Sequence, residues 1–239
     1  MEKKDILILK NIFREGPGLI EDVLMEHNLK HKIIEPDQIT QIKSIENLGA
    51  LIVLGGPNSA NDSDTQMKSE LALIRKVINA KIPYLGICLG LQTLVKASGG
   101  QVVKGETKEI GFRNHDDEFY KIRLTPQGRR DNLFKNLPDE FTVFQLHGET
   151  VKLPSEMILL ALGDTCENQI VKIGANAYGI QCHFELKAEM LDLWIEHDED
   201  LQLLDRNKVK SDYQTLHNDY QETGRQLISN FLSIAGFFH

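Results

Sequence analysis

Apolar runs and helical patterns alternate through the first hundred residues of the chain. The apolar runs are typical of buried strands and lie at residues 5–10, 31–35, 50–56 and 82–87. Helices are expected between and after them, at residues 19–27, 67–80 and 89–97. Strands that alternate with helices of this length predict a parallel sheet with helices on both faces.

The pattern changes after residue 101, where shorter strand-like runs are separated by turn residues. They lie at residues 119–124, 141–146, 157–162 and 169–173, and a near-continuous apolar strand follows at 177–185. Helical patterns return from residue 186. Apolar side chains from residue 216 recur at near-helical spacing, which favours packing of the last helix on the core, with a partner interface as the alternative. We therefore predict a single α/β domain over residues 1–239, with a doubly wound, mostly parallel sheet. Its core spans about 5–197, extra strands occupy the middle segment, and 198–239 form a helical C-terminal extension.

The composition argues against a nucleic-acid-binding protein, a membrane protein and a disulfide-stabilised protein. The 239 residues carry a net charge of -8, which argues against nucleic acid as a partner because a phosphate-binding surface is usually basic. No stretch approaches the roughly 20 apolar residues of a membrane-spanning helix. The three cysteines, Cys88, Cys166 and Cys182, are too few and too scattered for a disulfide framework or a metal knuckle. With no signal peptide in view, these features predict a cytoplasmic protein without nucleic-acid or membrane partners.

The residues Gly86-Ile87-Cys88-Leu89-Gly90 join a predicted strand directly to a predicted helix. A cysteine with glycine two positions away on each side is typical of a nucleophile at a sharp, strained corner. Its side chain would project at the carboxyl end of the strand, where open α/β sheets bind ligands, and the helix N-terminus would stabilise a thiolate. The alternative is a buried core cysteine between glycines that permit a turn. The position between strand and helix favours the nucleophile.

A cysteine nucleophile requires a base, and two of the eight histidines are candidates. His183 ends an apolar strand and is followed two residues later by Glu185. His147 also ends a predicted strand and is followed two residues later by Glu149. In either case the carboxylate could orient the imidazole, and spacing along the chain leaves both histidines open.

Acyl chemistry at Cys88 also requires N–H donors for a developing oxyanion. The backbone N–H of Leu89, directly after the corner, is the first candidate. The Gly55-Gly56-Pro57 loop follows a strand expected to neighbour that of Cys88, and paired glycines let an N–H face a ligand. A plain turn after a strand is the alternative there.

Several segments of the chain together resemble a known enzyme family. GGP at 55–57, GICLGLQ at 86–92 and YGIQCHFE at 178–185 resemble, in order and rough spacing, the defining segments of the class I (triad) glutamine amidotransferase family. Further segments resemble the glutaminase domain of GMP synthase and its free-standing relatives, namely KGETKEIGF (104–112), FTVFQLHGETVKLP (141–154) and CENQIVKIGANAYGIQ (166–181). The resemblance spans most of residues 5–195 and implies a flavodoxin-like fold.

The same resemblance implies a role for individual residues. These are the nucleophile Cys88, the base His183, the orienting carboxylate Glu185, the oxyanion-hole donors Gly56 and Leu89, and the substrate-pocket residues Gln92 and His147. No metal and no organic cofactor is implied for the reaction.

Two segments depart from the family pattern. The family usually has His-Pro-Glu where this chain has His183-Phe184-Glu185, so the stiffness that proline would give is missing. The segment 111–122 carries polar residues where the subgroup usually has an aromatic residue and a proline. We expect this segment to line the mouth of the site and to affect the choice of substrate or partner.

The function implied is hydrolysis of the side-chain amide of L-glutamine through a thioester on Cys88, with the ammonia passing to a separate synthetase. The sequence shows no phosphate-binding loop with which to use the ammonia itself. Two alternatives stay open: a free-standing peptidase or hydrolase acting on γ-glutamyl amides, and a catalytically silent binding module of the same fold. Glutamine is itself a γ-glutamyl amide, so the chemistry at the corner does not separate the first two functions.

Overall fold

The computed structural model describes residues 5–238, and its centre is a nine-stranded sheet. The strands are β1 (Asp5–Leu9), β2 (His31–Ile34), β3 (Leu48–Val53), β4 (Tyr84–Ile87), β6 (Lys121–Leu124), β7 (Glu140–Thr142), β9 (Met157–Gly163), β10 (Asn168–Ile173) and β11 (Ala177–Ile180). They are ordered β2-β1-β3-β4-β11-β10-β9-β6-β7. The first five in this order pair in parallel, and the remaining four add antiparallel pairs. The predicted α/β class with a parallel central sheet is confirmed.

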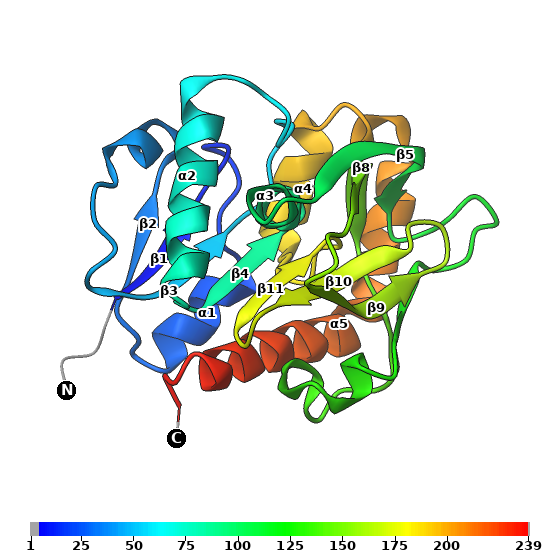
Figure 1. Cartoon of the computed structure of the whole chain (residues 1–239). Coiled ribbons are helices and arrows are strands. Elements are labelled where there is room, and N and C mark those ends of the chain that lie inside the picture. The colour runs from blue at the N-terminus through cyan, green and yellow to red at the C-terminus, as the bar shows by residue number, and fades with distance from the viewer. Residues whose placement is uncertain (1–4, 239) are drawn as a thin grey trace.

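Helices cover both faces of this sheet (Figure 1). The helices are α1 (Leu19–Glu26), α2 (Thr65–Asn79), α3 (Leu89–Ala97), α4 (Ala188–His197) and α5 (Arg206–Ile234), with short 3-10 helices at Pro36–Gln41, Gly128–Arg130, Asn132–Phe134 and Leu201–Leu203. The neighbouring residues Leu51 and Ile52 of β3 show why two layers form, because successive strand side chains point to opposite faces. Leu51 packs with the buried side chains of α2 and α3, whereas Ile52 packs with those of α1 and α5.

A second, two-stranded sheet, which the sequence patterns did not predict as a unit, stands beside the first. It pairs β5 (Gln101–Gly111) with β8 (Gln145–Lys152) in antiparallel fashion and is called the ribbon below. The expected single strand at 141–146 is therefore wrong, since β7 ends at Thr142 and β8 begins at Gln145. Between them the chain leaves the edge of the large sheet for the ribbon, and Phe144 forms an isolated bridge with His183.

The C-terminal segment packs on the core, as the apolar spacing predicted. Leu227, Ile228, Phe231 and Leu232 of α5 are buried in the same cluster as β1, β3 and α1. Farther towards its N-terminus, α5 contributes Tyr213 and Tyr220 to an aromatic cluster with side chains of α4 and of the chain around β5 and β8. The C-terminal half of α5 therefore packs against one face of the large sheet, and its N-terminal half packs near the carboxyl end of β11.

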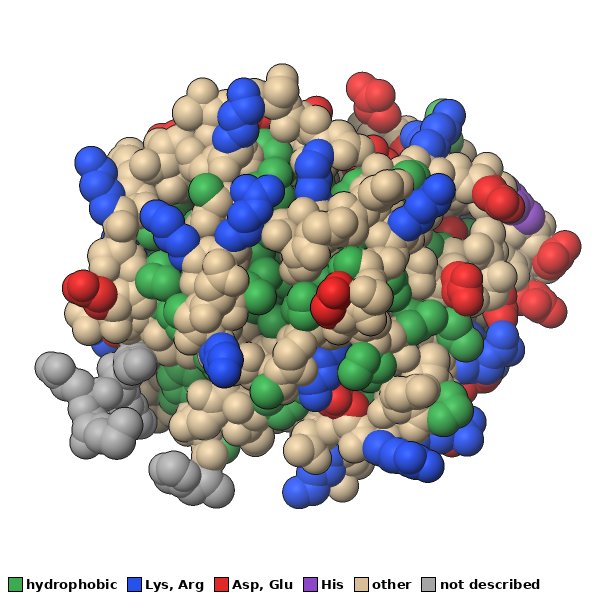
Figure 2. Space-filling model, viewed as in Figure 1, with side chains coloured by type: hydrophobic (Ala, Val, Ile, Leu, Met, Phe, Trp, Pro, Cys, Tyr) green, Lys and Arg blue, Asp and Glu red, His purple; other side chains and the backbone are tan. Residues whose placement is uncertain are grey.

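The surface shows no concentration of basic side chains on the face drawn in Figure 2, where Lys and Arg are spread singly among other residues. Within residues 5–238, none of the helices combines the length and the apolar character that crossing a membrane requires.

Candidate active site

Cys88 lies at the junction of β4 and α3 with a backbone conformation that side chains rarely adopt, at φ 51° and ψ -104°. The glycines on each side are a steric requirement of this corner. A Cβ on Gly86 would lie 2.2 Å from the carbonyl oxygen of Gly90, and a Cβ on Gly90 would lie 2.3 Å from that of Val53. Positive φ at a residue other than glycine costs free energy and tends to mark functional sites. The corner therefore has the geometry expected of a nucleophile.

His183 approaches Cys88 from the neighbouring strand, because β11 pairs in parallel with β4. A Cβ on Gly55 would lie 3.1 Å from Cε1 of His183 and 3.5 Å from Cβ of Cys88, so Gly55 leaves both side chains room to meet. The Nδ1 atom of His183 lies 2.7 Å from Oε1 of Glu185. The ring also packs edge-on against Trp194, with ring centroids 4.8 Å apart. Of the two candidate histidines, His183 is the one that the fold brings to Cys88.

Opposing effects act on the pKa of His183. Burial by itself lowers the pKa of the imidazole, but the Glu185 carboxylate and the hydrogen-bonded Cys88 side chain outweigh burial and raise the pKa well above its ordinary value. Both partners therefore favour the protonated form of the ring.

Phe184, which occupies the position where the family usually has proline, adds a hydrogen bond. Its backbone N–H donates to Oε2 of Glu185 at 3.0 Å, which a proline could not do. The hydroxyl of Tyr220 donates to the carbonyl oxygen of His183 at 2.9 Å. A Cβ on Gly224 would lie 2.3 Å from the carbonyl oxygen of Phe184, so α5 passes directly behind this segment. The His183-Phe184-Glu185 segment is thus held by contacts that do not depend on proline.

A cavity of about 640 Å³ opens in front of Cys88 and His183. Arg14 and Glu15, which the sequence patterns did not single out, line it from the loop after β1. The Nε atom of Arg14 is buried and has no hydrogen-bond partner among the described residues, so it is available to a ligand. Burial is the main cause that raises the pKa of Glu15.

The predicted oxyanion donors lie at the same corner. Gly56 lines the cavity, and a Cβ on it would lie 3.5 Å from Cδ2 of Leu89. Leu89 is the first residue of α3, where backbone N–H groups have no partner within the helix. β3 and β4 pair in parallel, so the Gly55-Gly56 loop and the Cys88 corner share one edge of the sheet, as expected.

Gln92 is buried one turn into α3 and also lines the cavity. Its Nε2 atom lies 3.4 Å from the carbonyl oxygen of Glu149 and 3.5 Å from Oε1 of Gln181. Gln181, which was not predicted, places Nε2 3.6 Å from the Cys88 sulfur. The available signal for it in the sequence was a polar amide residue inside the apolar run at 177–185.

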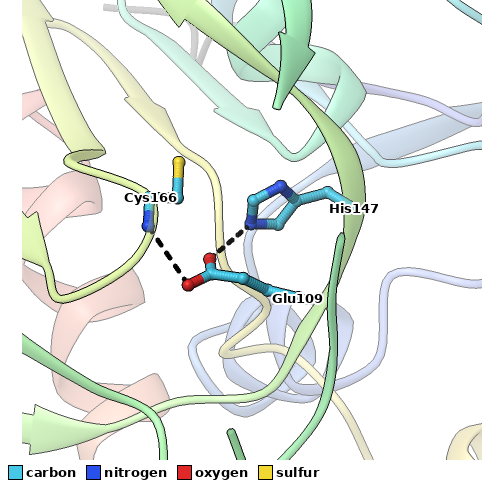
Figure 3. Close-up of side chains that lie close together, drawn as sticks. All are labelled: Glu109, His147 and Cys166. Atoms are coloured by element: carbon cyan, nitrogen blue, oxygen red, sulfur yellow. Dashed lines mark hydrogen bonds and ion pairs between the residues drawn. The ribbon is translucent and has the colours of Figure 1, made fainter. Parts of the chain in front are cut away.

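His147 lines the cavity but belongs to a separate cluster (Figure 3). Its Nε2 atom lies 2.9 Å from Oε2 of Glu109, and its Nδ1 atom lies 3.1 Å from the carbonyl oxygen of Glu149. The carboxylate of Glu149 instead accepts a hydrogen bond from Ser59. Both ring nitrogens of His147 are therefore engaged away from Cys88, which agrees with a place in the pocket wall.

The other two cysteines lie outside the cavity lining. Cys182 is buried, and burial raises the pKa of its thiol well above the ordinary value. Cys166 lies in the loop between β9 and β10, with its sulfur 3.1 Å from Oγ1 of Thr150. Burial is also the main cause of the raised pKa of Cys166.

The expectation that residues 111–122 line the mouth of the site is wrong. None of them borders the cavity, where Lys108 and Asp200 lie instead. Arg113 pairs with Asp212 of α5 at 2.8 Å and stacks on Phe119, with its guanidinium 3.9 Å from the ring centroid. The ion pair between Arg113 and Asp212 therefore attaches this segment to α5.

Glu70 of α2 is a further buried carboxyl group, next to Asn11 and Thr93 and not in the cavity. Burial raises its pKa from 4.5 to about 7. Asn11 in turn lies under the oxyanion loop, where a Cβ on Gly56 would lie 2.6 Å from the Cβ of Asn11.

Comparisons with known proteins agree with this geometry. Residues 18–197 match the family model described as glutamine amidotransferase class-I. The chain is 32% identical over 154 residues to the glutamine amidotransferase-like protein YfeJ of Salmonella typhimurium, covering 62% of each chain. It is 33% identical over 150 residues to a glutamine-hydrolysing GMP synthase subunit of Methanococcus aeolicus, covering 62% of this chain and 70% of that one.

A solved structure supports the fold over nearly the whole chain. The glutamine amidotransferase of Thermotoga maritima superposes with a TM-score of 0.86 at 26% identity, covering 97% of this chain and 99% of that one. Against the sequences of curated relatives the match is shorter. The chain spans 62% of the Salmonella protein and 26% of the GMP synthase of Borrelia garinii.

Proposed function

Because the chain belongs to the class-I glutamine amidotransferase family, we propose that it hydrolyses the side-chain amide of L-glutamine and releases ammonia. One observation carries the proposal. Cys88 stands at a positive-φ corner beside His183, with Gly55 leaving room between them, and the ring of His183 is held by Glu185. A thiol, an imidazole and an orienting carboxylate form the set that nucleophilic acyl chemistry requires.

In the first half of the reaction, the Cys88 sulfur attacks the amide carbon of glutamine and forms a C–S bond. The carbonyl oxygen becomes an oxyanion, and the N–H groups of Gly56 and Leu89 donate to it. His183 gives its proton to the amide nitrogen, the C–N bond breaks, and ammonia leaves. A glutamyl thioester remains on the sulfur. The raised pKa of His183 suits this step, because the ring holds a proton beside the leaving nitrogen.

In the second half, water takes the place that ammonia has left. His183, now neutral, removes a proton from the water as it attacks the thioester carbon. The C–S bond breaks and glutamate leaves. The sulfur is again a thiolate, and His183 carries the proton that it took from the water, as at the start of the reaction. Glu185 stabilises the charged ring in each half.

The charges around the cavity suit an amino acid in its zwitterionic form. Arg14 offers an unpartnered Nε to a carboxylate, and Glu15 offers an acceptor to an ammonium group. Gln92 and His147 line the same cavity. A volume of about 640 Å³ falls in the range of ordinary small-molecule sites. A γ-glutamyl peptide would fit as well, and this favours testing it beside glutamine.

The ammonia is proposed to pass to a synthetase on a separate chain. The support comes from relatives, since the Methanococcus aeolicus protein is named as one subunit of GMP synthase. The acceptor of the ammonia is left to experiment.

The test measures ammonia and glutamate released from L-glutamine, with glutathione assayed in parallel. The unmodified chain should turn over glutamine, and Cys88→Ala should lose all measurable turnover. Cys182→Ala, which removes a thiol outside the cavity, is the control and should retain activity. Full activity in Cys88→Ala would refute the proposal, and faster turnover of the peptide would favour the γ-glutamyl hydrolase.

A labelling experiment tests Cys88 even if the chain hydrolyses glutamine only when a partner protein is bound. A glutamine-analogue electrophile should modify Cys88 alone among the three cysteines, as read by mass spectrometry of the digested protein. Absence of labelling together with absence of turnover would show a catalytically silent module.

A further inference from the structure

A second group of cysteine, histidine and glutamate side chains converges outside the proposed reaction centre (Figure 3). Glu109 comes from β5, His147 from β8, and Cys166 from the loop between β9 and β10. The ligand-type atoms of the three side chains all lie within 4.8 Å of one another. The side chains of His147 and Glu109 are only 3% and 2% exposed. Nitrogen, oxygen and sulfur donors thus meet in a shielded place.

The hydrogen bonds of His147 define which ring nitrogen can bind an ion. A backbone carbonyl can only accept, so the contact between Nδ1 and the Glu149 oxygen at 3.1 Å puts a hydrogen on Nδ1. The nitrogen left for an ion is Nε2, 2.9 Å from Oε2 of Glu109, and its lone pair becomes available once the proton shared in that hydrogen bond has left. Imidazoles that bind metals commonly donate their other N–H to a carbonyl in this way.

Gln169 of β10 adds an unsatisfied oxygen to the same place. The residue is fully buried, and its Nε2 atom lies 3.2 Å from Oε2 of Glu109 and 3.3 Å from the carbonyl oxygen of Cys166. Its Oε1 atom has no hydrogen-bond partner among the described residues. A buried carbonyl without a partner costs free energy, and rotation of the amide would turn this oxygen towards Glu109 as a further ligand.

We propose that Glu109, His147 and Cys166 bind a divalent cation of the zinc class, with Gln169 or water as the fourth ligand. Mixed nitrogen, sulfur and carboxylate ligands are those that zinc prefers. Zinc lies about 2.0–2.3 Å from such ligands in a tetrahedron, so ligand atoms are about 3.5 Å apart. Atoms already within 4.8 Å of one another need only small movements to reach that spacing.

Binding at this site exchanges protons for the ion. The Cys166 thiol loses its proton and forms a bond from sulfur to the metal. The proton in the hydrogen bond between Nε2 of His147 and Glu109 also leaves, and that hydrogen bond is replaced by two metal bonds. The affinity should therefore fall as the pH is lowered.

The ion would join the ribbon to the loop between β9 and β10. Residue 147 follows Leu146, whose carbonyl oxygen lies 3.7 Å from the Cys88 sulfur, and both residues line the cavity. The site thus stabilises a wall of the cavity while the proposed glutamine hydrolysis proceeds without a metal. This inference does not depend on the proposed function.

The experiment titrates Co²⁺, a spectroscopic substitute for Zn²⁺, into the full chain carrying Cys88→Ala. That background is required because Cys88 and His183 could themselves bind a soft metal. We expect thiolate-to-cobalt charge-transfer absorption that saturates at one equivalent, disappears on addition of Zn²⁺, and is accompanied by a higher Tm. Adding Cys166→Ser should abolish the absorption, whereas adding Cys182→Ser should leave it. No absorption in Cys88→Ala, or absorption that survives Cys166→Ser, would overturn the proposal.

Protection from alkylation gives a second measurement that leaves the cluster intact. In the Cys88→Ala protein, Zn²⁺ at 100 times its dissociation constant should slow alkylation of Cys166 by about 100-fold, because only the metal-free protein reacts. Unchanged alkylation at every Zn²⁺ concentration would also overturn the proposal.

Discussion

The protein contains two clusters built from the same three residue types, and they are arranged for different chemistry. In the proposed catalytic cluster, Glu185 binds Nδ1 of His183 and leaves the other ring nitrogen for Cys88. In the ribbon cluster, a backbone carbonyl binds Nδ1 of His147, and Glu109 faces Nε2. The two histidines therefore differ in the ring nitrogen that contacts the carboxylate. Contact at Nδ1 leaves Nε2 free to exchange a proton with a thiol, whereas contact at Nε2 leaves His147 as part of the cavity wall.

The two cysteines differ in backbone as well as in partners. Cys88 is held at positive φ at the start of α3 and opens on the cavity. Cys166 lies in a strand-connecting loop, with its sulfur against Thr150 and its thiol pKa raised mainly by burial. We therefore expect reactivity to depend on the strained corner and on an oriented imidazole, and not on the mere presence of a thiol near a histidine.

The largest expected effect comes from exchanging the two histidines in turn for alanine. His183→Ala removes the proton donor and acceptor and should lower kcat for glutamine by about 10³–10⁴-fold. His147→Ala removes only part of the cavity wall and should act mainly on KM. Steady-state ammonia release over a range of glutamine concentrations measures both. A greater loss of kcat in His147→Ala would reverse the assignment of the base.

The carboxylates give the next effect, and it depends on pH. Glu185 raises the pKa of His183, so Glu185→Gln should lower that pKa and move the alkaline limb of the kcat profile to lower pH. We also expect kcat to fall by about 10²-fold at the optimum, since the charged ring loses its partner. Glu109→Gln, the matched change at the other histidine, should leave the alkaline limb in place. An unmoved limb in Glu185→Gln would contradict the proposed role of Glu185.

Glu70, a buried carboxyl group without an imidazole beside it, is expected to affect stability and to leave the reaction unchanged. Its pKa of about 7 in the folded state exceeds the ordinary 4.5. The folded state therefore holds the proton more tightly, and stability falls as the pH rises from about 4.5 to about 7. The loss amounts to about 3 kcal/mol.

Glu70→Gln cannot ionise and should remove most of this loss. Urea unfolding at pH 5 and pH 8 should therefore show a smaller difference in free energy than the unmodified chain does. Glu46→Gln, at an exposed position, should leave the difference unchanged. Equal pH dependence in Glu70→Gln and the unmodified chain would show that Glu70 ionises normally.

The corner at Cys88 was predictable because its signal is local. Two glycines and a cysteine between an apolar run and a helical pattern describe one turn of backbone, and the two glycine contacts show why no other residue fits. The helix after it, Leu89–Ala97, has the predicted bounds.

The choice between the two histidines was not local. Both have a glutamate two residues later, yet the carboxylate of Glu149 binds Ser59, and the partner of His147 is Glu109, 38 positions away. His183 reaches Cys88 because β11 inserts beside β4, a pairing of strands far apart in the sequence. Periodicity carries no information on such a pairing, and the family resemblance alone favoured His183.

The ribbon escaped prediction because its first strand lacks the usual pattern. Much of β5 is polar and exposed, and its pairing with β8 is irregular between Lys104 and Glu109. A strand that packs only a few side chains has too little alternation to be recognised. Glu109 was missed for the same reason.

The hydrogen bond from Tyr220 to the His183 carbonyl has a practical consequence for anyone who trims this protein. The family match stops at residue 197, but the helix that backs the histidine strand begins at Arg206. A protein truncated after residue 197 would keep every proposed reactive group, but it would lose the helix that packs behind His183. Engineering should therefore treat α5 as an inseparable part of the reaction centre.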